Sequence, residues 1–216
     1  MFRKTSIILA LAIALLAVPA SAASINFLDS SWNPGASHTF TRDLGYLGAG
    51  WAGTTLTVTS IPTNLYWDNN DGNGYADGFG VTGGENDEVD RREVLAFTFN
   101  KPVFLQSVGI TDLFYESTSH PYIEKGFYSI DGGANQLFQA AAGQLINVTN
   151  GITSLDLGNT SGQAVVFTAY NVSGENHDYS VSGINATLTQ TPEPGTLILL
   201  GSALFGGAFL RRRRRS

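Results

Sequence analysis

The sequence predicts an all-β protein. We expect a single antiparallel β-sandwich domain, jelly-roll-like, flanked by an N-terminal signal peptide and a C-terminal transmembrane helix. The middle of the chain is rich in Gly, Thr, Ser and Asn, which favour strands and turns over helices. Thr54–Thr59 and Leu95–Phe99 alternate with a period of two, as half-buried strands do. Turn sequences such as Asn150-Gly151 recur at short intervals, which is typical of sandwiches.

About ten short strands follow from these patterns. In chain order they are Ile25–Leu28, His38–Thr41, Thr54–Thr59, Leu95–Phe99, Val103–Thr111, Gly126–Ile130, Leu145–Thr149, Ile152–Leu157, Ala164–Tyr170 and Ser180–Leu188. The tripeptide Asn100-Lys101-Pro102 indicates a turn between two of them. Gln136–Ala142 is expected to form a short helix.

The N-terminal residues 1–22 have the layout of a secretory signal peptide. Arg3 and Lys4 precede the apolar run Ile7–Val18, and Ala20-Ser21-Ala22 supplies the small residues that signal peptidase requires. We therefore expect export and cleavage after Ala22. The alternative is an N-terminal membrane anchor that is never cut, which the shortness of the apolar run disfavours.

Residues 23–190 form the expected extracytoplasmic domain. Seven of the 12 basic residues and one of the 18 acidic residues lie outside it, so it keeps five cations and 17 acids, a formal charge of −12. Nucleic acid is an unsuitable partner for such a surface, whereas divalent cations are suitable counterions. The chain has no cysteine, which excludes disulfides and thiol chemistry.

The segment Asp68–Gly78 contains Asn, Asp and Gly at the spacing of a calcium-binding loop. Oxygen ligands at alternate positions surround one ion, and the glycine allows the sharp turn. The expected ligands are Asn69, Asp71, Asn73, the carbonyl of Tyr75, and Asp77. Asn replaces the usual first Asp and the bidentate Glu is missing, so further ligands would come from Glu85, Asp87, Glu88 or Asp90. A solvated turn without metal explains the same residues, and both interpretations remain open.

The acidic stretch Glu85–Glu93 also permits other interpretations. It favours a solvated charged loop, then metal binding, and least of all the paired carboxylates of a glycosidase. Gly78–Gly83 matches G-x-G-x-x-G, but no helix is expected after it, so a dinucleotide site is rejected. Neither H-E-x-x-H nor G-x-S-x-G occurs. We expect no catalytic residues.

Tyr66 and Trp67 lie beside the expected calcium loop. Exposed aromatic rings can stack on the flat faces of sugars, although large aromatics in a sandwich more often fill the core. Neighbouring residues in a strand face opposite sides, so one of the two rings is expected to be available for carbohydrate.

The C-terminal residues 191–216 have three parts. Pro192-Glu193-Pro194 is held extended by its prolines, Gly195–Leu210 is uncharged, and Arg211, Arg212, Arg213, Arg214 and Arg215 follow. A helix over about 195–210 would be about 24 Å long, slightly short for the hydrocarbon core of a bilayer. The arginines are expected to stay in the cytoplasm by the positive-inside rule, with the domain outside.

These three parts together resemble the PEP-CTERM sorting signal. The resemblance implies a Gram-negative, exopolysaccharide-producing host, and an exosortase that recognises the tripeptide and removes the tail. It implies a passage from a single-pass state in the inner membrane to the cell surface or extracellular matrix. On this basis we expect a non-catalytic protein that associates with exopolysaccharide. The alternatives are a secreted glycoside-active enzyme with the same tail, and a membrane-anchored lectin that is not processed.

Overall fold

Ten β-strands and three single-turn 3₁₀ helices account for the regular structure of the described residues. The computed structural model describes residues 22–68, 77–83, 88–90, 92–115, 123–141, 152–170 and 177–189. The strands are β1 Ala22–Asn26, β2 Thr39–Asp43, β3 Thr55–Ile61, β4 Leu65–Asp68, β5 Gly78–Val81, β6 Val94–Thr111, β7 Lys125–Ile130, β8 Gln136–Gln139, β9 Thr153–Ala169 and β10 Ser180–Leu188. The 3₁₀ helices are η1 Ser30–Trp32, η2 Gly45–Leu47 and η3 Ala49–Trp51.

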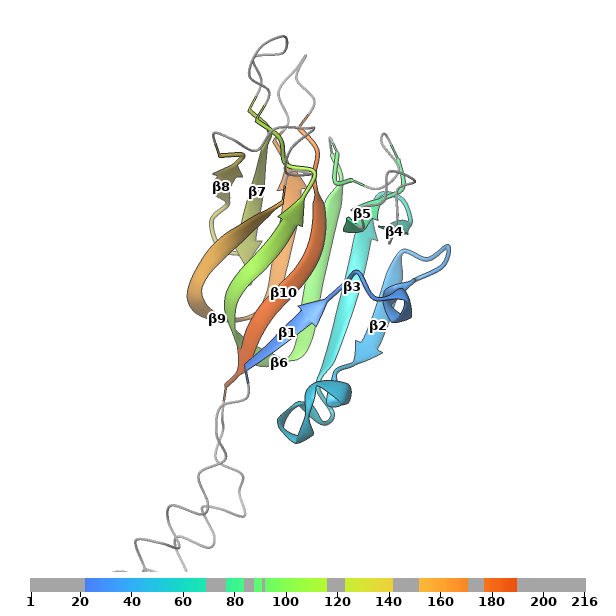
Figure 1. Cartoon of the computed structure of the whole chain (residues 1–216), viewed down its shortest axis with the longest axis vertical. Coiled ribbons are helices and arrows are strands. Elements are labelled where there is room, and N and C mark those ends of the chain that lie inside the picture. The colour runs from blue at the N-terminus through green and yellow to red at the C-terminus, as the bar shows by residue number, and fades with distance from the viewer. Residues whose placement is uncertain are drawn as a thin grey trace, which may run out of the picture. The chain divides into compact units, whose positions relative to one another are not determined.

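All strands pair antiparallel in one continuous sheet that curls on itself (Figure 1). The long strands β6 and β9 pair with each other along both of their halves. The first half of β6, Val94–Phe99, has β3 on its other side, whereas the second half, Val103–Thr111, has β10 there. The sheet therefore has two layers that share β6 and β9, and the all-β prediction is confirmed.

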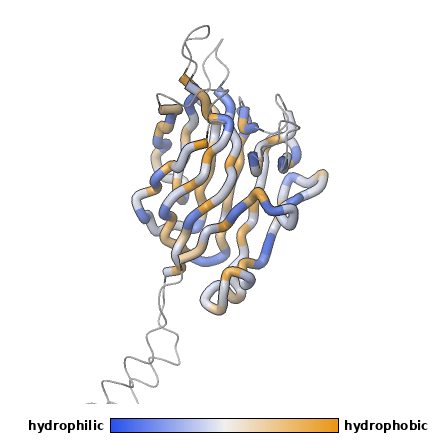
Figure 2. Tube along the Cα trace, in the orientation of Figure 1, coloured by the Kyte–Doolittle hydropathy of each residue, from blue (hydrophilic) through white to orange (hydrophobic). Residues whose placement is uncertain are grey.

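The core lies between the two layers and is rich in aromatic rings. Phe97, on the first half of β6, stacks on Phe27 with ring centroids 5.1 Å apart. Its edge meets Phe79 of β5, in the opposite layer, at 6.2 Å. All three rings are buried. Hydrophobic and hydrophilic residues alternate along the strands (Figure 2), because one side of each strand faces this core and the other faces outward.

The tripeptide Asn100-Lys101-Pro102 does not separate two strands, and that prediction is wrong. β6 continues through it, with a register shift against β9 between Thr98 and Val103. The Asn100 side chain accepts a hydrogen bond from Thr55 N at 2.9 Å and donates one to Gly53 O at 3.0 Å. These contacts let the strand bend without leaving polar groups of the adjoining segment unpaired.

The expected strands Ile152–Leu157 and Ala164–Tyr170 are likewise one strand, β9, with a second register shift opposite Leu105–Ser107. The short helix expected at Gln136–Ala142 is also wrong. Residues Gln136–Gln139 form edge strand β8 against β7. Phe138 is buried while Leu137 and Gln139 face solvent, and this alternation suits a strand rather than a helix. The expected strand Leu145–Thr149 lies outside the described residues.

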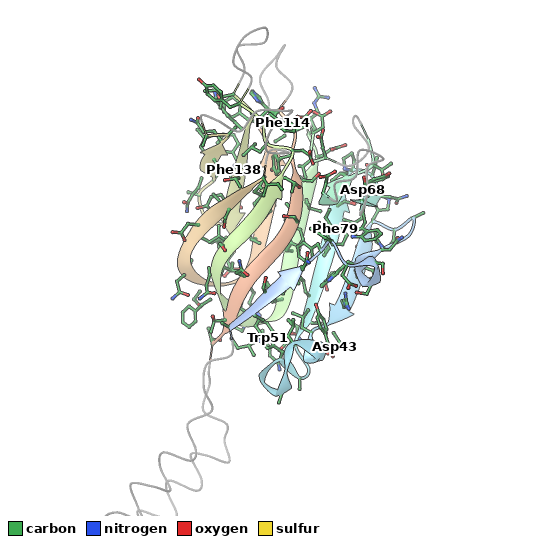
Figure 3. All side chains as sticks on the ribbon, viewed as in Figure 1. Asp43, Trp51, Asp68, Phe79, Phe114 and Phe138 are labelled. Carbon is green, nitrogen blue, oxygen red and sulfur yellow. The ribbon has the colours of Figure 1, made fainter. Side chains whose placement is uncertain are left out.

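The two ends of the sandwich are distinct, and we name them here. The bend end is where β6 and β9 pass between the layers, and it includes Arg42–Thr54, Asn100–Pro102 and Asp131–Gly133. The loop end is the opposite end, reached by the ends of β4, β5 and β10 at Leu65, Val81 and Ser180. Figure 3 labels Asp43 and Trp51 at the bend end, and Asp68 and Phe114 at the loop end.

Candidate functional site

Acidic side chains gather at the loop end. Of the 12 acidic residues in the described part of the chain, eight lie there: Asp68, Asp77, Glu88, Asp90, Glu93, Asp112, Glu124 and Asp178. The same end has two cations, Arg92 and Lys125, which leaves a formal charge of −6. The bend end has Arg42 and Lys101 against Asp43, Asp131 and Asp29, which lies near Arg42, and its formal charge is −1. The loop end is thus the acidic face of the domain.

Several of these acids hold backbone rather than face solvent. The carboxylate of Glu93 accepts a hydrogen bond from Asp90 N at 2.8 Å, and Glu93 N donates to Asp90 O at 3.0 Å. The carboxylate of Glu124 accepts one from Phe114 N, while Glu124 N donates to Phe114 O at 3.1 Å. Both side chains are buried. Each carboxylate therefore fixes the segment that leads into or out of a strand.

Only some residues of the predicted calcium site belong to the described part of the chain. Asn69, Asp71, Asn73, Tyr75, Glu85 and Asp87 lie outside the described residues. Asp77, which directly precedes β5, is buried, and its backbone carbonyl accepts a hydrogen bond from the hydroxyl of Thr111 at 2.7 Å. Glu88 and Asp90 are half-buried, and Glu88 O accepts from Val81 N. Among the described residues, no group of three or more His, Cys, Asp and Glu side chains could hold a metal ion.

The two aromatics expected to meet sugar have different environments. Tyr66 on β4 is 37% exposed. Trp67 is half-buried against the core, and its indole N–H donates to Phe27 O at 2.6 Å. Of this pair, Tyr66 presents the open ring, as the alternation of side chains along a strand requires. Carbohydrate stacking at this position stays a prediction.

A second exposed aromatic, Tyr46, was not predicted from the sequence. The Arg42 guanidinium lies between two rings, with its central carbon 4.7 Å from the Trp32 centroid and 4.5 Å from that of Tyr46. Burial raises the pKa of Tyr46, and the charge of Arg42 opposes that rise. The stack ties η1 and η2 to β2. The three residues follow no common period in the sequence, so no local pattern could have revealed it.

Both ends of the domain's chain lie at the bend end. Ala22 of β1 is paired with Thr187 of β10, and Leu188 is paired with Val103. The hydroxyl of Thr189 donates to Pro102 O at 2.7 Å. The compact unit of the chain runs from Ser21 to Thr189, so every strand is complete within it. The sorting residues Pro192, Glu193, Pro194 and Arg211 to Arg215 follow it and lie outside the described residues.

Comparison with known proteins identifies the C-terminal segment. Residues 190–215 match the family model of the PEP-CTERM protein-sorting motif, as the resemblance predicted. None of the curated proteins matches the chain. A solved structure described as GH31 CBM32-2 bound to GalNAc aligns with 80% of this chain and 100% of its own, with 14% identity and a TM-score of 0.25. This likeness is too weak to support an argument about fold or ligand.

No helix in the described part of the chain is long and apolar enough to cross a membrane. The predicted span at about 195–210 lies outside that part.

Proposed function

We propose that this chain is an exported exosortase substrate: signal peptidase removes residues 1–22, and exosortase removes the tail at Pro192-Glu193-Pro194. The domain then remains at the cell surface or in the extracellular matrix. The observation that carries the proposal is the PEP-CTERM motif at residues 190–215, which begins directly after the compact unit ends at Thr189.

The arrangement of the domain supports processing at both ends. A cut after Ala22 would leave most of β1 on β10, because Ala23 to Asn26 pair with Ala186 to Gly183. A cut at the tripeptide lies beyond Thr189 and touches no described strand. Loss of both terminal segments therefore shortens β1 by Ala22 alone and leaves the other strands and the core complete.

The test is the mass of the mature protein from hosts with and without the sorting enzyme. We expect a C-terminus at or near the tripeptide in the first host and an intact Arg211 to Ser216 in the second. Replacing Pro192, Glu193 and Pro194 by alanine should preserve the arginines in both hosts. An intact tail on the surface form of the wild-type chain, in a host that has the enzyme, would reduce the protein to a membrane-anchored β-domain.

We further propose that the displayed domain associates with exopolysaccharide without catalysis, and that the loop end is its binding face. The acidity of that end and the exposed ring of Tyr66 favour this assignment. Calcium bound through Asn69, Asp71, Asn73, Tyr75 and Asp77 would rigidify the segment between β4 and β5. It would also bridge the acidic surface to anionic sugars.

Thermal unfolding with calcium and then with chelator tests the metal. At a calcium concentration 100 times the Kd, binding adds about 2.7 kcal/mol to the free energy of unfolding. The double variant Asp71→Ala, Asn73→Ala should lose this increment, whereas Asp156→Ala, an exposed acid outside the loop end, should retain it. An unchanged midpoint in wild type would eliminate the calcium site. Co-sedimentation with host polysaccharide, compared between wild type and Tyr66→Ala, tests the sugar.

A further inference from the structure

We propose that, before the tail is removed, the bend end rests on the outer surface of the bilayer, with the uncharged segment Leu44–Thr54 in contact with lipid headgroups. The acidic loop end then points away from the membrane. This inference rests on the proposed membrane step of the sorting tail. It adds the face of the domain that meets the lipid and the segment that makes the contact.

The first argument is the reach of the linker. The expected membrane segment begins at about residue 195, and the last described residue is Thr189. Five residues lie between them, and the six Cα–Cα steps from Thr189 to residue 195 span at most about 22 Å when fully extended. The linker therefore reaches no farther than about 22 Å from Thr189, which is held to Pro102 at the bend end.

The second argument is what lies beside that exit point. Lys101, adjacent to Pro102, donates from Nζ to Ala52 O at 3.3 Å. The Asn100 side chain donates to Gly53 O. These bonds connect the C-terminal exit directly to the segment that carries η2 and η3. The segment Leu44–Thr54 is therefore next to the place where the chain leaves the domain.

The third argument is the chemistry of this segment. Leu44–Thr54 contains no charged residue, and Gly48, Ala49, Gly50, Ala52 and Gly53 are all exposed. Tyr46 is 53% exposed, and tyrosine is favoured at the membrane–water interface. The Arg42 guanidinium that stacks on its ring carries a positive charge and the nearby Asp29 a negative one, so this pair is neutral and does not repel an anionic headgroup.

The fourth argument is the charge difference between the ends. The loop end carries a formal charge of −6 and the bend end a formal charge of −1, counted over the described residues. An anionic bilayer surface therefore repels the loop end much more strongly than the bend end. Electrostatics and the tether therefore favour the same orientation.

Contact quenching tests this orientation in the full-length chain. Because the chain has no cysteine, Ala49→Cys at the bend end and Ile152→Cys at the loop end each create one labelling site. Both positions are exposed, and β6 from Val103 to Thr111 separates the two ends by up to about 30 Å. Each variant is labelled with a small fluorophore and reconstituted with its tail in phosphatidylethanolamine–phosphatidylglycerol vesicles that carry a headgroup quencher.

We expect loss of fluorescence at position 49 and none at position 152. Adding Tyr46→Glu should reduce the quenching at position 49, whereas the matched control Leu137→Glu, at an equally exposed site on β8, should leave it unchanged. Equal quenching at both positions, or none at 49 in chains that float with the vesicles, overturns the orientation alone. Failure of both labelled chains to float with the vesicles instead contradicts the proposed membrane step.

Discussion

The loop end and the bend end of this domain are built from the same strands, yet their chemistry differs. The loop end collects eight of the 12 described acids, several of them buried and committed to backbone hydrogen bonds. The bend end has a formal charge of only −1 and holds both chain exits. An antiparallel sheet separates chemistry in this way because each strand returns the chain to the opposite end. Residues far apart in the sequence thus meet at one end.

The core between the ends should contribute most to stability. Phe97→Ala removes a buried ring that contacts Phe27, Phe79 and Phe167, and should lower the free energy of unfolding by about 3–5 kcal/mol. Urea unfolding followed by tryptophan fluorescence measures this. Trp51 reports on the bend end and Trp67 on the β4 side of the loop end. We expect a single transition, because the two layers share one hydrophobic core. Two separated transitions would show that the ends unfold independently.

Two glycines with positive φ allow two costs of a Gly→Ala substitution to be compared. One is the steric overlap of the added Cβ, and the other is the strain of a left-handed backbone alone. Gly78 at the loop end has φ +100°, and a Cβ there would overlap the carbonyl of Val181. Gly132 at the bend end has φ +71° and open space around it. We expect Gly78→Ala to cost about 3 kcal/mol or more and Gly132→Ala about 1 kcal/mol. Equal costs by chemical denaturation would contradict the close approach of β5 to β10.

Removal of a buried carboxylate should lower the free energy of unfolding more than removal of an exposed one, but the difference should be smaller than that between the two glycines. Glu93→Ala removes the acceptor of Asp90 N in a buried position and should cost about 1–3 kcal/mol. Asp131→Ala removes an exposed acceptor of two backbone N–H groups, those of Gln163 and Ala164, and should cost about 1 kcal/mol. The comparison requires thermal or urea unfolding at neutral pH. A larger loss at Asp131 would mean that burial does not govern the value of these bonds.

The smallest expected effect is an increase in the free energy of unfolding. The hydroxyl of Tyr179 is buried and has no hydrogen-bond partner in the described part of the chain, so Tyr179→Phe should stabilise the protein by about 1 kcal/mol. Burial also raises the pKa of Tyr179 well above 10. The folded state therefore keeps this phenol neutral. The free energy of unfolding is unaffected by its titration below pH 10 and falls as the pH rises above that value, because only the unfolded state ionises readily there.

Unfolding of Tyr179→Phe between pH 8 and 11 checks both parts of that prediction. The variant should lose less stability above pH 10 than the wild type. Tyr46→Phe is the comparison, because burial also raises the pKa of Tyr46 but that ring is half open to solvent. Destabilisation by Tyr179→Phe at neutral pH would indicate that the hydroxyl has a partner.

The sequence alone was sufficient to predict the features that depend on residues close together in the chain. Alternation at Thr54–Thr59 and Leu95–Phe99 predicted strands, because a period of two places one side of a strand on the core. The Pro-Glu-Pro tripeptide, the apolar run and the arginines revealed the sorting motif, because its three parts are contiguous. The acid excess was also countable directly.

Only the tertiary structure decided which distant residues meet. The bend at Asn100-Lys101-Pro102 looked like a turn, because the groups that sustain the strand there, on Gly53 and Thr55, are 45 or more residues away. Glu93 was interpreted as part of a solvated acidic loop until its backbone donor and its burial were known. Pairing of Ala22 with Thr187 brings the two chain exits together beside an uncharged segment. Hydrogen bonding and packing across the sheet are non-local, so composition and spacing carry no record of them.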